Sequence, residues 1–130
     1  MRKYDETKRL KVLGINVDSN TVFIKYIPNT ARAIQKELGC TEFGSDAFVS
    51  HGETYRVLYD QEGLCKIKPK ASVVSESGQP MVVGNILIVK DKSDWSEFLS
   101  LDMNDIRRLM LHIEFNEDFG YHVFVKGENS

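Results

Sequence analysis

The feature that most constrains the fold is a series of short runs in which apolar and polar residues alternate between turn-forming residues. The runs LKVLGINV and TVFIKYI flank Asp18-Ser19-Asn20 within residues 10–27, and TYRVLYD and YHVFVK repeat the pattern at residues 54–60 and 121–126. Successive side chains of a β-strand point to opposite faces, so each run can line one face of a sheet with apolar residues. The pattern predicts a chain rich in strands, with a hairpin over residues 10–27.

Three other segments carry weaker strand signals. Residues 40–53 hold apolar side chains without a sustained period, so we expect an irregular strand or loop there. Residues 81–89, MVVGNILIV, are predicted to form one strand in which Gly84 marks a bulge or close packing. The stretch CKIKPK at residues 65–70 follows the turn-forming Gln61-Glu62-Gly63, which predicts a hairpin with residues 54–60.

Two segments have the features of amphipathic helices. The first is predicted to begin with Asn29 or Thr30 as N-cap, to carry Ala31, Ile34 and Leu38 at helical spacing on its apolar face, and to end at a left-handed Gly39. The second is predicted to begin at Asp102, with Asp105 in its first turn, where a carboxylate is favourable. Its predicted inner face consists of four apolar residues: Ile106, Leu109, Met110 and Ile113.

Together these segments predict a single α+β domain over residues 1–130. We expect a mostly antiparallel sheet of about five to six strands, with two amphipathic helices packed on it. Residues 1–9 and 127–130 are polar and are predicted to be flexible ends. A chain of 130 residues with 42% hydrophobic residues is long enough to bury a core of its own.

Charge and cysteine usage narrow the functional classes. The 17 basic and 19 acidic residues give a net charge of −2, which is too balanced for a general nucleic-acid coat or for a DNA mimic. Cys40 and Cys65 have no zinc-binding spacing with the three histidines, and no secretory signal precedes them. We therefore expect a reducing cytoplasm, and the short apolar runs predict no membrane partner.

Four stretches, in order, resemble a small domain family of unknown function found in phage, prophage and plasmid proteins of bacteria. They are NTARAIQKELG (29–39), YRVLYDQEGLCKIKPKASVV (55–74), MVVGNILIV (81–89) and FLSLDMNDI (98–106). The chain departs from the family where Gly39-Cys40 replaces a paired glycine and where Lys70 and Ala71 replace an Asn-Arg pair. The resemblance implies a mobile-element origin in a bacterial cytoplasm and transfers no catalytic residue.

The stretch CKIKPK offers a candidate binding site. On a strand, Lys66, Lys68 and Lys70 would point to one face. One interpretation, which we favour, is an edge strand protected from aggregation by lysines and a proline. The alternative is an anion site, in which Tyr55 and Tyr59 on the neighbouring strand serve as stacking platforms rather than as packing residues.

Three other groups of charged residues are candidate binding sites. Arg107 and Arg108 are predicted on the outer, solvent-facing side of the second helix, where they could add to a phosphate-binding surface. Histidine and carboxylate side chains occur in two further segments: His112, Glu114, Glu117, Asp118 and His122 in one, and Asp46, His51 and Glu53 in the other. Neither has a spacing that fixes two metal ligands on one face, so no metal is predicted.

No motif in the chain announces a reaction. The sequence lacks GxSxG, a Walker glycine loop and GxGxxG, and neither cysteine has the setting of a reactive thiol, so no catalytic residue and no cofactor is predicted. We therefore predict a non-enzymatic accessory protein that binds a host protein, as an inhibitor of a defence system of the anti-CRISPR or anti-restriction type. The alternative is a nucleic-acid or nucleotide-binding module that uses Lys66, Lys68 and Lys70. A homo-oligomer is a further option, because residues 21–27 offer a pairing edge.

Overall fold

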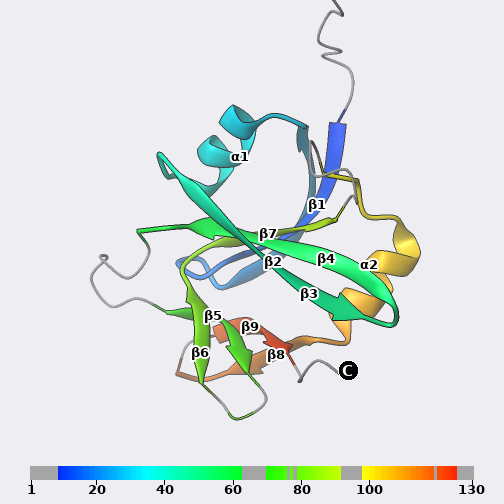
Figure 1. The fold of residues 1–130 in the computed structure, drawn as a ribbon. Helices are drawn as coiled ribbons and strands as arrows, with labels where there is room; N and C mark the ends of the chain where they lie inside the picture. The colour runs from blue at the N-terminus through cyan, green and yellow to red at the C-terminus, as the bar shows by residue number, and fades with distance from the viewer. Residues whose placement is uncertain are drawn as a thin grey trace, which may run out of the picture.

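The computed structural model describes residues 9–62, 70–75, 77, 79–91, 98–118 and 120–125 (Figure 1). Within them the chain is α+β, as predicted, with more strand than helix. The helices are α1 (Ala31–Leu38) and α2 (Met103–Met110). The strands are β1 (Arg9–Asn16), β2 (Thr21–Pro28), β3 (Phe43–Ser50), β4 (Glu53–Asp60), β5 (Ala71–Ser75), β6 (Pro80–Val83), β7 (Ile86–Lys90), β8 (Ile113–Asn116) and β9 (Gly120–Val125).

The strands form two sheets, not the one sheet of five to six strands that was predicted. The larger sheet has the order β2-β1-β7-β4-β3 and is antiparallel throughout. The smaller sheet has the order β6-β5-β9-β8, and its β5 and β9 run parallel. The larger sheet lies between two other layers, with α1 on one side and the smaller sheet and α2 on the other (Figure 1).

Strand alternation divides the core between the two faces of the larger sheet. On β1, Leu10 and Val12 pack with Ile34 and Leu38 of α1, whereas Leu13 and its alternate neighbours pack with α2 and the smaller sheet. β7 is buried on both faces, which explains why its sequence ILIVK is a continuous apolar run and not an alternating one. The larger sheet therefore has two covered faces in its centre.

Two hairpins build the outer parts of the larger sheet. The predicted hairpin over residues 10–27 is confirmed, because β1 and β2 pair along their whole length. The expectation of an irregular segment at residues 40–53 was wrong, since β3 pairs with all eight residues of β4. β3 lies at the sheet edge with exposed residues on both faces, so it lacks the one-sided apolar pattern that identifies a half-buried strand.

The predicted hairpin between residues 54–60 and 65–70 is also wrong. β4 has both of its edges occupied, by β3 on one side and by β7 on the other. Residues 65–69 lie outside the described residues, and Lys70 precedes β5 in the smaller sheet. Gln61 and Glu62 do form a turn after β4, but both edges of β4 are already paired with other strands.

The run Met81–Val89 forms two strands in different sheets, and not one strand. β6 belongs to the smaller sheet and β7 to the larger one. Gly84 lies between them with a φ of 89°, a conformation that glycine adopts without the strain a side chain would impose. The side chain of the next residue, Asn85, accepts a hydrogen bond from the Val17 backbone N–H and so fixes the crossing to β1.

The two helices match their predicted starts, and only the first matches its predicted end. In α1, Thr30 is the N-cap and Gly39 the left-handed C-cap. Ile34 and Leu38 are buried as predicted, whereas Ala31 in the first turn is exposed.

α2 begins after Asp102 as predicted, but it ends at Met110. Met110 is exposed and Ile113 opens β8, so both were wrongly placed on the inner face of this helix. The apolar period continues past the helix end into a strand, which hides the boundary in the sequence.

The predicted flexible ends, residues 1–9 and 127–130, lie outside the described residues except for Arg9, which opens β1. Among the residues that the structure describes, no helix is long and apolar enough to cross a membrane.

Candidate functional site

Only one of the three lysines of the CKIKPK stretch lies within the described residues. Lys66 and Lys68 lie outside the described residues. Lys70 is exposed at the start of the smaller sheet, where its backbone carbonyl accepts a hydrogen bond from Gly84. Whether the three lysines form an anion site or a protected edge therefore stays a prediction.

The two tyrosines of β4 point into the molecule. Tyr55 is 0% exposed, so its ring is not accessible as a stacking platform for a base. Its hydroxyl donates to Asp105 Oδ1 at 2.7 Å, and burial together with this carboxylate raises the pKa of Tyr55 to about 12. Tyr59 is half-buried and donates to Asp46 at 3.3 Å; burial and that carboxylate raise its pKa. Both tyrosines act in packing.

The two arginines of α2 differ in how exposed they are and in their contacts. Arg107 is exposed, as predicted. Arg108 is partly exposed, with 32% of its side chain accessible, and its Nη1 lies 3.2 Å from Asp105 Oδ1 and 3.3 Å from the Tyr55 hydroxyl. Because this guanidinium already pairs with a carboxylate, Arg108 is less available to a phosphate than Arg107 is.

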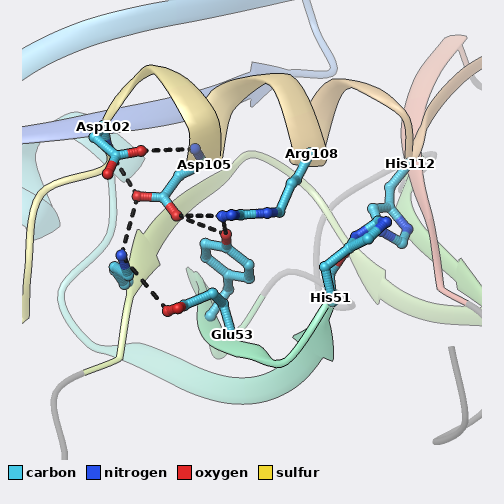
Figure 2. A network of polar contacts seen from close by, with 9 residues as sticks. His51, Glu53, Asp102, Asp105, Arg108 and His112 are labelled. Atoms are coloured by element: carbon cyan, nitrogen blue, oxygen red, sulfur yellow. Dashed lines mark hydrogen bonds and ion pairs between the residues drawn. The ribbon is translucent and has the colours of Figure 1, made fainter.

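Arg108 belongs to a polar network centred on the fully buried Asp105 (Figure 2). The Oδ2 atom of Asp105 accepts from the Asp102 backbone N–H at 2.8 Å and lies 3.3 Å from Lys90 Nζ. Lys90 Nζ also lies 3.5 Å from Glu53 Oε1, so α2, β7 and β4 meet at this point. The network ties the helix to the larger sheet through one carboxylate.

The network keeps Asp105 charged. Burial alone would raise the pKa of this carboxyl, but the Asp102 backbone N–H, the Tyr55 hydroxyl and the Lys90 ammonium together hold it below its ordinary value. Burial would likewise lower the pKa of Lys90, and Asp105 outweighs that effect and raises it. Asp102 in turn accepts from the Asp105 backbone N–H at 2.8 Å, which completes a capping box. The sequence indicated the cap but not the second, inward role of Asp105.

A second polar cluster joins the β3–β4 turn to the region after α2. Ser50 is 1% exposed, and its Oγ lies 2.8 Å from His112 Nε2 and 3.0 Å from His51 Nδ1. His112 Nδ1 lies 3.1 Å from the Phe124 carbonyl, which can only accept, so that nitrogen carries the proton. The Ser50 hydroxyl then donates to His112 Nε2. A serine buried this deeply is closed to a substrate, and we interpret the cluster as a structural junction.

The remaining histidine and carboxylate candidates do not gather. His122 is buried and lies 4.0 Å from the exposed Glu114. Among the described residues no three histidine, cysteine or acidic side chains are placed to hold a metal ion. A surface depression of about 520 Å³ beyond the end of α1 is lined by residues of both charges: Gln35, Lys36, Gly39, Cys40, Thr41, Asp60 and Glu62. Its lining shares no residue with either polar cluster.

Large apolar side chains are exposed on β2 and at the start of α2. Ile24 and Tyr26 are 50% and 56% exposed on β2, and Met103 is 54% exposed on α2. Lys11 of β1 lies between them, with its Nζ 5.8 Å from the centre of the Tyr26 ring and 3.8 Å from Met103 Sδ. We call Ile24, Tyr26, Met103 and Lys11 the β2 strip.

The register explains why the β2 strip is exposed. Leu13 faces Ile24 across the β1–β2 pair, and Lys11 faces Tyr26. Leu13 belongs to the core that contains α2 and the smaller sheet, so Ile24 and Tyr26 lie on that same face. β2 is the edge strand, and the covering layer does not reach these two residues.

The Asp105 network fixes the position of Met103, the residue of the β2 strip that α2 supplies. The capping box fixes the first turn of α2, which carries Met103. Immediately before it, the Leu101 backbone N–H donates to the Lys11 carbonyl at 3.0 Å, and Ser100 Oγ accepts from the Lys11 backbone N–H at 2.9 Å. The strip is therefore built on backbone that is hydrogen-bonded on both sides.

Searches against protein-family models, curated proteins and solved structures find no match to this chain.

Proposed function

We propose that the protein is a non-enzymatic binding module that acts by occupying a surface on another protein. The observation that carries this proposal is the β2 strip, where large apolar side chains lie exposed side by side on an edge strand. Contiguous exposed apolar surface is uncommon in soluble monomers and is typical of contact sites. Aromatic and methionine side chains are also the types enriched at the centre of protein interfaces.

The more specific proposal is a mobile-element accessory protein of a bacterial cytoplasm whose partner is a host protein. An inhibitor of a host defence system, of the anti-CRISPR or anti-restriction type, would act by such occupation. Its support is the resemblance of residues 29–39, 55–74, 81–89 and 98–106 to the phage and plasmid domain family. The resemblance supports only the proposed origin, and the β2 strip supports only the proposed binding.

The nucleic-acid alternative has weaker support. Tyr55 is buried and Arg108 is paired with Asp105, so two of the residues considered for it are committed elsewhere. Lys70 and Arg107 are exposed and remain available to a phosphate. Among the described residues, the one cation–π contact is that of Lys11 with Tyr26, so neither Lys70 nor Arg107 is paired with an aromatic ring in this way.

A capture experiment separates these proposals. Tagged wild-type protein would be incubated with bacterial lysate, once untreated and once nuclease-treated, beside the double variant Ile24→Ser/Tyr26→Ser. The control is Met81→Ser, which changes an equally exposed apolar residue on an edge strand of the smaller sheet. We expect one protein partner that is retained by the wild type and the control and lost by the double variant. Retention by all three proteins, or recovery of nucleic acid alone before nuclease treatment, would overturn the proposal.

A further inference from the structure

We propose that the β2 strip recognises a protein segment that carries a carboxylate between apolar side chains, and that Lys11 binds this carboxylate. The inference rests on the proposed function and names the chemistry of the partner. It begins from the state of Lys11, which lies half-buried between Tyr26 and Met103.

Lys11 differs from Lys25, Arg56 and Lys90, three cations of the larger sheet that already pair with a carboxylate. Lys25 Nζ lies 2.9 Å from Glu37, Arg56 Nε lies 3.1 Å from Asp91, and Lys90 lies 3.3 Å from Asp105. Among the described residues, Lys11 Nζ forms no ion pair, and its contacts are the Tyr26 ring and the Met103 sulfur. Neither contact supplies the charge-assisted hydrogen bond that a carboxylate would form with the ammonium.

The surroundings of Lys11 favour an anion that arrives with apolar neighbours. Ile24, Tyr26 and Met103 would exclude water once an apolar segment covers them, and an ion pair strengthens as water is excluded. An apolar segment without a charge would instead bury the ammonium unpaired, which is costly. The β2 strip therefore selects for a carboxylate as well as for apolar side chains.

Selection from a library of random displayed peptides tests this inference with defined probes. Wild-type protein serves as bait, and binders that also bind Ile24→Ser/Tyr26→Ser are removed. We expect the remaining peptides to share Asp or Glu flanked by apolar residues. The variant Lys11→Glu should instead select Lys or Arg at that position, because the charge at the centre of the strip is reversed.

Affinities of the selected peptides supply the quantitative test. Lys11→Met should weaken binding by about tenfold and remove most of its salt dependence, as expected for loss of one partly desolvated charge pair. The matched control is Lys25→Met on the opposite face of β2, where the lysine is already paired with Glu37, and it should bind as the wild type does. Thermal unfolding of each variant verifies that the fold is retained.

The outcomes distinguish this inference from the proposed function. Peptides that need Ile24 and Tyr26 but show no preference for a carboxylate would overturn the inference and leave the binding function standing. Failure to select any peptide that depends on the strip would overturn the inference, while the lysate capture independently decides the function. Self-association of the wild type that is abolished by Ile24→Ser/Tyr26→Ser would show that a second copy occupies the strip and would also overturn it.

Discussion

At the scale of single residues, one buried carboxylate organises the helix end that supports the β2 strip. Asp105 accepts from the Tyr55 hydroxyl and the Asp102 backbone and lies beside Lys90 and Arg108. A buried charge is tolerated only when such partners surround it. These contacts of Asp105 explain how a short helix of eight residues is held firmly enough to present Met103.

Asp105→Asn should destabilise the fold in a pH-dependent way. The pKa of Asp105 is lower in the folded state than its unfolded value of about 4, so the charged carboxylate contributes stability above pH 4 that is lost as the pH falls through the folded pKa. In the variant, Lys90 no longer has a carboxylate at position 105 to pair with. The free energy of unfolding should therefore fall by roughly 3 kcal/mol at neutral pH. Urea unfolding should show this deficit shrinking in acid. An equal deficit at both pH values would mean that the charge is not what matters.

Ser50→Ala tests the junction between the β3–β4 turn and His112. The substitution removes the hydroxyl that bonds both His51 and His112, so we expect a loss of about 1–2 kcal/mol. The control is Ser19→Ala, where an exposed turn hydroxyl contacts Thr21 and little stability should change. Denaturant titration compares the two. A Ser50 variant as stable as the control would rule out a structural role and would reopen the question of what the buried hydroxyl does.

At the scale of elements, the pairing of β1 with β2 determines which side chains form the strip. Gly14 faces Phe23 across the pair, and a side chain at Gly14 would collide with the Phe23 ring. The outer end of the ring therefore lies over the glycine on the α1 side of the sheet. This contact leaves Ile24 and Tyr26 on the opposite face, where the strip is found.

Gly14→Ala should cost about 1–3 kcal/mol, because the Phe23 ring must move. In a Phe23→Leu background the same substitution should cost less, since the smaller side chain leaves room for the added methyl group. A double-mutant cycle by chemical denaturation measures this coupling. Equal penalties in both backgrounds would contradict the packing of Phe23 on Gly14.

The sequence predicted local elements better than their partners. Caps and alternation identified α1, the start of α2 and the β1–β2 hairpin, because these depend on neighbouring residues. The partner of β4 was predicted wrongly because the choice between a neighbouring strand and β7 is made by the core and not by the turn. The split of residues 81–89 into β6 and β7 was hidden because both strands are apolar.

For the candidate site, too, local features were predictable but contacts between distant residues were not. The edge position of residues 21–27 was predicted, and β2 is indeed an edge strand. Lys11 and Met103 are 92 positions apart, so their meeting beside Tyr26 follows only from the fold. The inward roles of Tyr55 and Arg108 likewise depend on Asp105, which no local pattern connects to β4.

At the scale of the whole molecule, the larger sheet is covered at its centre and exposed at β2. α1 covers one face, and α2 with the smaller sheet covers the other, so Ile24 and Tyr26 are exposed at the margin of a well-packed core. Interfaces of this kind place rigid apolar anchors on a scaffold that does not need to rearrange on binding. The architecture thus presents the strip as a preformed surface.

Photocrosslinking from position 26 tests most directly whether the β2 strip binds another protein. A photoreactive phenylalanine analogue would replace Tyr26 in one variant and the equally exposed Met81 in another, and each would be irradiated in bacterial lysate. We predict a discrete crosslinked protein from position 26, absent from position 81 and suppressed by Ile24→Ser. Crosslinks that are the same from both positions, or none from position 26, would contradict a binding role for this strip.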